Sequence, residues 1–576
     1  MSDLFVGKLR ALRPLAVIGA IGVVVAACGN GTSTTPSASL AADQTLRFPS
    51  DSDIGTLDPA QINAETDVEL YQNLFDGLLK FDDTLKVIPD IATALPTISA
   101  DGMTYTFKLN ANAKFWNGHA VKASDFIYSF SRSAAEGGNA YGSNFDHVVG
   151  YDVVSKTKDW AHNQTMLSGM SAPDDHTLQI KLISPWYVFS TELALASAAQ
   201  VIDPTVVNTD DANWWSKPAT AVGTGPYKMV SYIPKQSAAF DAVPNWWGSP
   251  QPTVQHVKID FIADMSQGVV KYEQGGYDLI GYGGMGSDTP TADIIRIQAD
   301  PTLSKQLKFV NKVRTIWVQY AFGPPPSGSG RAQSVFAGDL ESGPAHDLRL
   351  AFSLAIDRTQ MVNVACANGI TCSAATGGLI TKGLRGYVGD NSDPLAKFDL
   401  TQAKALLKSG DPTGSKTKNL TYYYDPNKAI YKATAENVAS QWQTNLGIHV
   451  NLQPIDHAAF IKNYTAHNYV LFREGWQADY DHPQDWFDNL FIKGGGSNGG
   501  DYTDPKVEAL VKKADAEPLD AAIADYNAAS KQMMTDAAYA PLAYFKGEFM
   551  FKPYLIHAGS NNFNDFYWNE MQIGSH

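Results

Sequence analysis

The chain lacks several motifs that mark common classes of enzyme. Its 576 residues contain no GxxxxGK[S/T] phosphate loop and no HExxH zinc motif, so nucleotide hydrolysis and zinc protease chemistry have no local support. GYGGMG at 281–286 matches a dinucleotide fingerprint, but SDTPT follows where a helix would have to begin. The histidines are scattered without the close spacing of metal ligands. We therefore predict no catalytic residue, no cofactor and no metal.

The N-terminus has an apolar run, but this run is shorter than a membrane-spanning helix. The run 15–27 follows three basic residues and falls short of the roughly 20 residues of a spanning helix, which is typical of a signal peptide. It ends in Val-Ala-Ala before Cys28, which resembles a bacterial lipobox. An ordinary signal with a chance cysteine is the alternative. We expect residues 1–27 to be a lipoprotein signal peptide, Cys28 to be diacylated, and 28–43 to be a flexible tether.

Cysteine is scarce, since the chain has only three. If Cys28 carries lipid, Cys366 and Cys372 remain as a pair outside the reducing cytosol. We expect them to form a disulfide, and closing so small a loop contributes about 2–2.5 kcal/mol on the entropic account. A metal site is the rival interpretation, although two thiols without a nearby histidine fall short of the four ligands that zinc usually has.

Positive charge is in deficit. The 44 Lys and Arg residues stand against 59 Asp and Glu residues, which gives a net charge of -15. An acidic surface repels nucleic acid and anionic lipid, so we expect no nucleic-acid partner and no membrane contact except through the lipid anchor. The length and the 44% hydrophobic composition suffice for large cores and predict two or three domains.

Helical and strand patterns interleave along the whole chain. The alternating apolar residues of 103–110 and 176–183 predict two half-buried strands. Ser124, Thr401 and Asp504 each precede an apolar-periodic segment and are predicted as helix N-caps. This mixture favours an α/β or α+β fold over an all-β sandwich.

A series of segments, in order along the chain, resembles one known family. They are TLDPA (56–60), LFDGLL (74–79), DGMTYTFKLNANAKFWNGHAVKASDFIYSFSR (101–132), GTGPYKM (223–229), LRLAFSLAIDR (348–358), AKALLKSG (403–410), WQTNLGIHVNLQ (442–453), GWQADYDHP (475–483) and YTDPKVEAL (502–510). The set is similar to the extracellular solute-binding proteins of peptide ABC importers, the oligopeptide/dipeptide-binding family of family 5 type. The resemblance implies an α/β fold, a periplasmic-binding-protein-like, two-lobed Venus flytrap with an extra small α+β domain.

The resemblance also implies a domain layout in which the first lobe is discontinuous. The expected segments are 44–75, 188–313 and 546–576 for lobe I, 76–187 for the extra small domain, and 314–545 for lobe II. Two crossing segments between the lobes would form a hinge, and ligand would bind in the cleft that the lobes close.

Within that cleft the resemblance assigns the ligand's α-amino group to Asp479, the acid of GWQADYDHP. An ammonium in a dry cleft needs a fixed carboxylate, since two unit charges about 4 Å apart gain on the order of 4 kcal/mol at an effective dielectric near 20. Arg473 matches a position that can meet a short peptide's carboxylate through its planar fork. The alternative for Asp479 is a structural salt bridge. Asp481, Asp485 and Asp488 are expected to be surface or capping acids.

The remaining predicted ligand contacts rest on the same resemblance and are Gly475, Trp476, Gln477, Tyr480, Tyr141, Asn63, Ala64 and Glu65. Backbone groups around Gly475 and Gln477 would pair with an extended peptide as an added strand does. Trp476 and Tyr480 would wall side-chain pockets. The loop 63–65 would pair with the other side of the peptide.

We therefore expect a monomeric, lipid-anchored binding component of an ABC importer on the outer face of the bacterial cytoplasmic membrane. It would capture short peptides and deliver them to a permease whose ATPase subunits supply the energy. Asp456 and His457 stand where oligopeptide binders tend to have an acid and a tryptophan. A non-peptide ligand, such as a small oligosaccharide or a metal chelate, therefore remains open. A surface hydrolase that uses the cleft carboxylates is the alternative from a different class.

Overall fold

The computed structural model describes residues 39–62, 65–135, 141–195, 199–281, 289–559 and 566–576. Residues from Leu40 to His576 form one compact unit. The predicted signal peptide, Cys28, Asn63, Ala64 and most of the GYGGMG motif lie outside the described residues. Among the helices of the described part, none has the length and apolar character needed to cross a bilayer.

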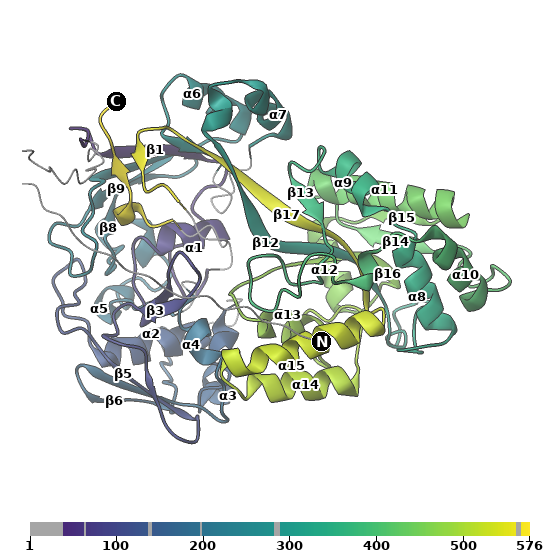
Figure 1. Cartoon of the computed structure of the whole chain (residues 1–576). Helices are drawn as coiled ribbons and strands as arrows, with labels where there is room; N and C mark the ends of the chain where they lie inside the picture. Colours follow the sequence, from purple (N-terminus) through teal and green to yellow (C-terminus); the bar gives the residue numbers. More distant parts are fainter. Residues whose placement is uncertain (1–38, 63–64, 136–140, 196–198, 282–288, 560–565) are drawn as a thin grey trace, which may run out of the picture. The chain divides into compact units, whose positions relative to one another are not determined.

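The largest sheet is built around two long antiparallel strands, β12 (Leu307–Tyr320) and β17 (Tyr539–Phe551), which lie side by side in Figure 1. The strand order is β11-β17-β12-β16-β14-β15, and β13 pairs with β17. The shorter strands are β11 (Leu279–Ile280), β13 (Cys372–Ala374), β14 (Thr421–Tyr424), β15 (Asn451–Pro454) and β16 (Leu471–Gln477). Strand β16 pairs with β12 along its whole length but with β14 only at Leu471 and Phe472.

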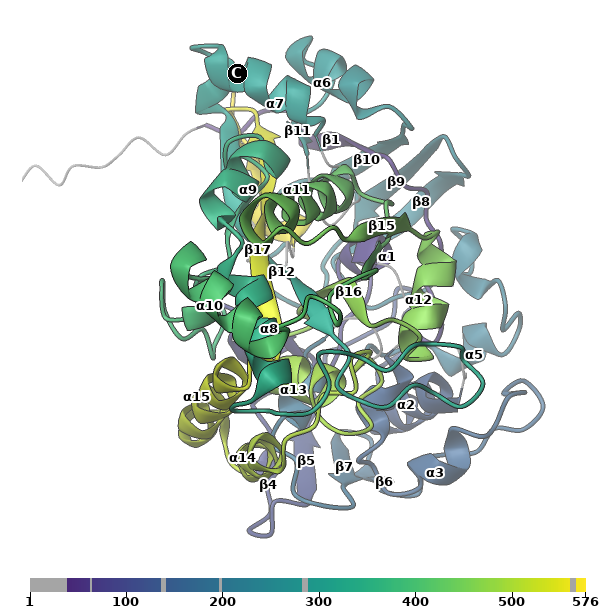
Figure 2. The same ribbon diagram turned by 90° about the vertical axis from the view of Figure 1, so that its right-hand side faces the viewer.

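Helices cover both faces of this sheet because successive residues of β12 point to opposite sides. Ile316 and Val318 pack with α8 (Pro344–Leu354) and α11 (Ala429–Leu446). Trp317 packs instead with α13, α14 and α15, and Figure 2 shows α14 and α15 side by side. The bounds of the other helices around the sheet are α9 (Arg358–Ala365), α10 (Leu400–Gly410), α12 (His457–Thr465), α13 (Gln484–Leu490), α14 (Pro505–Asp515) and α15 (Leu519–Thr535). The middle of β12 is thus buried on both faces.

Two further four-stranded sheets form in the first half of the chain. One has the order β1-β10-β9-β8, and the other β4-β5-β7-β6. Their strands, with the two small pairs β2–β3 and β18–β19, are β1 (Thr45–Ser50), β2 (Leu79–Phe81), β3 (Val87–Pro89), β4 (Thr97–Ile98), β5 (Thr104–Lys108), β6 (Met170–Asp174), β7 (Thr177–Lys181), β8 (Tyr227–Ile233), β9 (Ser237–Ala242), β10 (His256–Phe261), β18 (Leu555–Ile556) and β19 (Gln572–Ile573). The remaining α-helices are α1 (Glu65–Tyr71), α2 (Ala123–Ala135), α3 (Tyr151–Val154), α4 (Phe189–Glu192), α5 (Pro204–Val207), α6 (Met265–Glu273) and α7 (Thr291–Ala299).

The local predictions meet mixed outcomes. The two predicted strands are confirmed as β5 and β7, which pair with each other and bury their alternating apolar side chains. Asp504 caps α14 as predicted, since its side chain accepts from the Lys506 N–H over 2.8 Å. The caps at Ser124 and Thr401 are wrong. Ser124 lies inside α2, and Asp399 caps α10 by accepting from the Gln402 N–H over 3.0 Å.

The predicted disulfide residues lie together in the core between α9 and β13. The structure joins Cys366 and Cys372 in a disulfide whose Cα atoms are 5.3 Å apart. Both cysteines are fully buried. The domain boundaries stay a prediction, and two of them, after residues 313 and 545, fall within β12 and β17.

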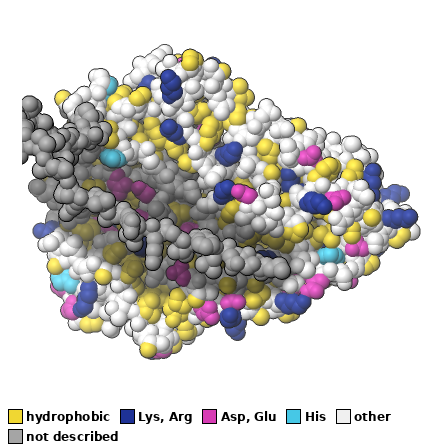
Figure 3. All heavy atoms as spheres, viewed as in Figure 1, with side chains coloured by type: hydrophobic (Ala, Val, Ile, Leu, Met, Phe, Trp, Pro, Cys, Tyr) yellow, Lys and Arg dark blue, Asp and Glu magenta, His cyan; other side chains and the backbone are white. Residues whose placement is uncertain are grey.

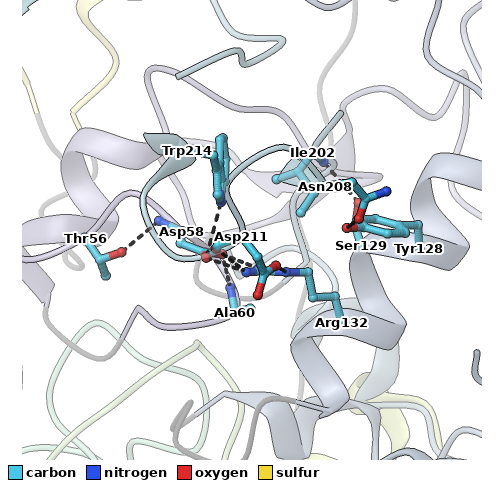
Figure 4. A network of polar contacts seen from close by, with 10 residues as sticks. All are labelled: Thr56, Asp58, Ala60, Tyr128, Ser129, Arg132, Ile202, Asn208, Asp211 and Trp214. Carbon is cyan, nitrogen blue, oxygen red and sulfur yellow. Dashed lines mark hydrogen bonds and ion pairs between the residues drawn. The ribbon is translucent and has the colours of Figure 1, made fainter. Parts of the chain in front are cut away.

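A buried ion pair connects the TLDPA segment to helix α2 (Figure 4). The guanidinium of Arg132 donates to both carboxylate oxygens of Asp58, over 2.6 and 2.8 Å, and its Nε donates to Asp211 over 2.9 Å. Both side chains of the Asp58–Arg132 pair are fully buried. Trp214 adds a donor to Asp58 at 3.3 Å. Two motifs of the resemblance are thus held together by one charge pair.

Candidate ligand-binding site

Strand β16 presents backbone to a possible ligand because only one of its edges is fully paired. Gly475 opposes Ile316 and Gln477 opposes Arg314 in the antiparallel register with β12. On the other edge, within the part of the chain that the structure describes, no strand pairs with β16 beyond Phe472. Gly475 also approaches β12 closely, since a Cβ there would lie 2.8 Å from Cγ2 of Ile316. The predicted residues 475–477 therefore lie on a partly open strand edge.

Asp479 lies two residues after β16 and lines a cavity of about 260 Å³. The other lining residues are Tyr141, Ser143, Asn144, Asp146, His147, Trp186, Glu192, Tyr480, Gln484, Asp485, Asp488 and Asn489. Tyr141 Oη approaches Oδ1 of Asp479 at 3.4 Å, the long end of the hydrogen-bond range. Three of the predicted site residues, Tyr141, Asp479 and Tyr480, are thus brought to one cavity.

The turn after β16 is held by Asp485, in the first turn of α13. Oδ2 of Asp485 accepts from the backbone N–H of Asp479 over 3.1 Å and from Nε1 of Trp476 over 3.0 Å. The predicted residue Trp476 thus fixes the turn through Asp485. Tyr480 is buried, and its hydroxyl donates to Oε1 of Gln484 over 2.6 Å. These contacts hold Tyr480 in the cavity wall and Trp476 against Asp485.

The expectation that Asp481, Asp485 and Asp488 are surface or capping acids is wrong. Asp481 is buried, and its carboxylate accepts from the backbone N–H and from Nε of Arg385, over 2.6 and 2.9 Å. Asp485 is only 3% exposed, and Asp488 is half-buried at the cavity wall. Helix α13 turns back against β16, which the linear sequence does not reveal. Sequence reasoning therefore missed Asp485 and Asp488 as cavity residues.

Burial changes the acid–base properties of these carboxyl groups. Burial raises the pKa of Asp485 well above its ordinary value, and the neighbouring Asp479 raises it further. Burial also raises the pKa of Asp488 to about 6 and that of Glu192 well above its ordinary value. Removing a carboxylate from water disfavours its charged form. These three carboxyl groups therefore retain their protons to a higher pH than exposed carboxyl groups do.

The structure places Arg473 in a separate cluster with Asp425 and His457. Nη2 of Arg473 lies 3.2 Å from Oδ2 of Asp425, and Nδ1 of His457 lies 2.9 Å from the same oxygen. The guanidinium also covers the Tyr431 ring at 4.0 Å. Nε of Arg473 is buried without a hydrogen-bond acceptor among the described residues, so the side chain retains a donor for another carboxylate. Its role with a ligand stays a prediction.

The loop predicted to face the other side of the ligand cannot be placed in full. Asn63 and Ala64 lie outside the described residues, and Glu65 begins helix α1. His457, which departs from the family pattern, and its neighbour Asp456 both have local partners. Asp456 caps α12 by accepting from Ala458 N–H, and His457 pairs with Asp425.

An acidic cavity thus lies next to the partly open edge of β16, in a fold whose three larger sheets are mixed or antiparallel. The sequence model of the bacterial extracellular solute-binding proteins, family 5 Middle, matches residues 86–498. The chain belongs to this family. It is accordingly a binding protein that acts outside the cytoplasm, and not an enzyme.

Known relatives match almost the whole chain. The periplasmic murein peptide-binding protein MppA of Escherichia coli K12 is 26% identical over 530 residues, which cover 90% of this chain and 91% of MppA. The periplasmic oligopeptide-binding protein OppA of Salmonella typhimurium is 24% identical over 572 residues, which cover 98% and 99%. The solved structure of MppA in its unliganded open form superposes with a TM-score of 0.76 at 24% identity, covering 94% of this chain and 99% of that one. The predicted α/β, Venus flytrap fold is confirmed.

Proposed function

We propose that this protein is the peptide-capturing subunit of an ABC importer, and that Asp479 receives the free α-amino group of a short peptide. The open edge of β16 beside the Asp479 cavity is the observation that supports this most directly. A peptide extended along 475–477 would gain main-chain hydrogen bonds that do not depend on its sequence. The relatives named for murein peptide and oligopeptide binding support the same ligand class.

Other parts of the site have supporting roles in this proposal. Trp476 and Tyr480 wall the space for the first side chains, Tyr141 contributes from the opposite wall, and the loop 63–65 meets the far side of the peptide. Arg473 offers a donor to the carboxylate of a peptide of suitable length. Strands β12 and β17 contain the predicted domain crossings and serve as the hinge on which the two lobes close. Lobe I consists of 44–75, 188–313 and 546–576, and lobe II of 314–545.

The membrane parts of the proposal rest on sequence. Cys28 after Val-Ala-Ala would be diacylated and would tether the mature protein to the outer face of the cytoplasmic membrane. Two acyl chains hold firmly where a single chain binds only weakly. There, as a monomer, it would pass its ligand to a permease with ATPase subunits. Replacing Cys28 by serine should move the protein from the membrane fraction to the soluble fraction, and unchanged membrane association would contradict the anchor.

The experiment that tests the ligand class compares a free tetra-alanine peptide with its N-acetylated form by calorimetry. The unmutated protein should bind the free peptide at least about tenfold more tightly, which corresponds to about 1.4 kcal/mol. Asp479→Asn should remove most of this difference, because the amide leaves the ammonium without a counter-charge. Equal affinity for the two peptides in the unmutated protein would overturn the role of Asp479. Native mass spectrometry of the purified protein gives an independent readout, and a single sugar or chelate in the cavity would overturn the peptide class.

A further inference from the structure

Arg314, on strand β12, differs from the other arginines of the described chain in its hydrogen bonding. Each of the others donates to a carboxylate or to a backbone carbonyl. The side chain of Arg314 donates to no described residue, and its Nε is buried from solvent. Its guanidinium lies 5.8 Å from the centroid of the Phe545 ring, at the outer limit of a cation–π contact. A buried donor without an acceptor costs free energy, so Arg314 gains from an acceptor that comes from outside the chain.

The missing acceptor is unexpected in so acidic a protein. The chain has a net charge of -15, and on the face drawn in Figure 3 basic side chains lie interspersed with acidic ones. The buried arginines that carry their charge into the fold also have acids beside them, as Arg132 has Asp58 and Arg473 has Asp425. Arg314 forms no ion pair with any residue that the structure describes.

The backbone at Arg314 departs from regular pairing. Asn311 pairs with Lys546 of β17, and the next paired residue of β12 is Thr315, opposite Tyr544. Three residues of β12, with Arg314 as the last, thus oppose the single residue 545. Such a bulge bends its strand and re-aims its side chains, and bulges are frequent next to active sites.

On its other edge β12 is paired with β16, the strand proposed to bind the peptide. Arg314 is the cross-strand partner of Gln477, and cross-strand partners have their side chains on the same face of a sheet. A ligand residue that pairs with Gln477 would therefore direct its side chain to the face of Arg314. Neighbouring strands are about 4.8 Å apart, so this ligand residue would lie two strand spacings from β12. Two long side chains extended toward each other can bridge that distance.

We infer that Arg314 binds a carboxylate side chain of the ligand, so that the protein prefers peptides whose second or third residue is acidic. The inference rests on the proposed function and narrows its substrate class. Asp479 lies two residues beyond Gln477, at most about 7 Å of extended chain. An α-ammonium at Asp479 therefore brings the second or third ligand residue level with Gln477. The planar guanidinium can hold a carboxylate through two parallel hydrogen bonds, which supplies the acceptor that Nε lacks.

The test uses two pairs of tetrapeptides with free N-termini, and the members of each pair differ in one charge. Ala-Glu-Ala-Ala is compared with Ala-Gln-Ala-Ala, and Ala-Ala-Glu-Ala with Ala-Ala-Gln-Ala. Calorimetry at 0.15 M salt restricts repulsion from the acidic surface to about 8 Å. The unmutated protein should bind the glutamate peptide of one pair at least about fivefold more tightly than its glutamine counterpart. The absence of any glutamate preference in both pairs would overturn the inference and leave the proposed function in place. Failure of all four peptides to bind would overturn both.

Variants of Arg314 locate the preference. Arg314→Gln should abolish it, and Arg314→Lys should retain part of it, because an ammonium keeps the charge but lacks the planar fork. Arg296→Gln is the matched control, since it makes the same substitution on α7, where Arg296 pairs with Glu273; it should leave the preference unchanged. Thermal unfolding verifies that each variant folds, and the peptide pairs test the unmutated protein in any case. A glutamate preference that persists at full strength in Arg314→Gln would overturn the assignment of Arg314.

Discussion

The backbone N–H of Asp479 donates to Oδ2 of Asp485 over 3.1 Å, so the residue proposed to meet the ligand is positioned by a second acid. Trp476 donates to the same oxygen, which connects strand β16, the turn and helix α13 at one atom. Burial and the proximity of Asp479 both raise the pKa of Asp485. Asp485 therefore retains its proton to a higher pH than an isolated aspartate would.

Asp485→Ala should weaken peptide binding without removing a group that touches the ligand's ammonium. Loss of the acceptor frees the Asp479 N–H and the Trp476 indole, and an unsatisfied buried donor costs about 1–3 kcal/mol. We expect affinity for free tetra-alanine to fall by about tenfold, as measured by calorimetry. Asp83→Ala changes an exposed acid and should leave affinity as it is. Unaltered affinity of the Asp485 variant would show that the turn does not need this acceptor.

Binding of a cationic peptide should release protons near pH 6.5. The pKa of Asp488 is raised to about 6 by burial, and those of Asp485 and Glu192 are raised well above their ordinary values. A bound cation favours the ionised forms, lowers these pKa values and so displaces protons to the solvent. Titration calorimetry in phosphate and in imidazole, whose ionisation enthalpies differ, should give different apparent binding enthalpies. Identical enthalpies in the two buffers would mean that the cavity carboxyl groups are already ionised before binding.

Glu474 should make the folded state less stable as pH rises. Its side chain is 5% exposed, and burial raises its pKa to about 8. In the unfolded chain it ionises near its ordinary value of about 4.3, so between that pH and about 8 the unfolded state loses its proton first. The contribution of protonated Glu474 to the free energy of unfolding is therefore complete below about pH 4, and it declines as the pH rises toward 8.

Glu474→Gln should remove this pH dependence. The amide oxygen can still accept from Oη of Tyr464, which lies 2.7 Å from Oε1 in the unmutated protein. Relative to the unmutated protein, the variant should gain at least about 1.4 kcal/mol of unfolding free energy, one pKa unit, on going from pH 5 to pH 8. Urea unfolding at the two pH values measures this. A constant difference between the two proteins would contradict the raised pKa.

Asp58→Ala should be strongly destabilising because it leaves the fully buried Arg132 without its bidentate partner. Breaking a buried pair by removing one member costs about 3–5 kcal/mol. Asp211→Ala is the control, since Asp211 also bonds Arg132 but its side chain is 27% exposed. Its loss should cost clearly less in urea unfolding. Equal costs for the two variants would mean that burial of the Asp58 pair does not govern its energy.

Local patterns predicted some elements well and failed where the fold brings distant residues together. Alternation sufficed for β5 and β7 because one face of each is buried, and Asp504 caps α14 through contacts within its own turn. Helix α10 begins at Leu400, two residues earlier than a cap at Thr401 requires, so Asp399 is the N-cap. The ordered motifs indicated the family and fold correctly, since many segments had to agree.

The sequence by itself determined the class of protein, its extracytoplasmic setting through the family, and the acid in the ADY step as the candidate for the ligand's amine. Tertiary structure alone decided which other acids join it. Asp146 and Glu192 come from segments almost 300 residues or more before Asp479 along the chain, and Asp485 and Asp488 reach the cavity because α13 folds back on β16. Burial then raised the pKa values of Glu192, Asp485 and Asp488, an effect that depends on the surrounding packing and so is invisible in a linear pattern of charges.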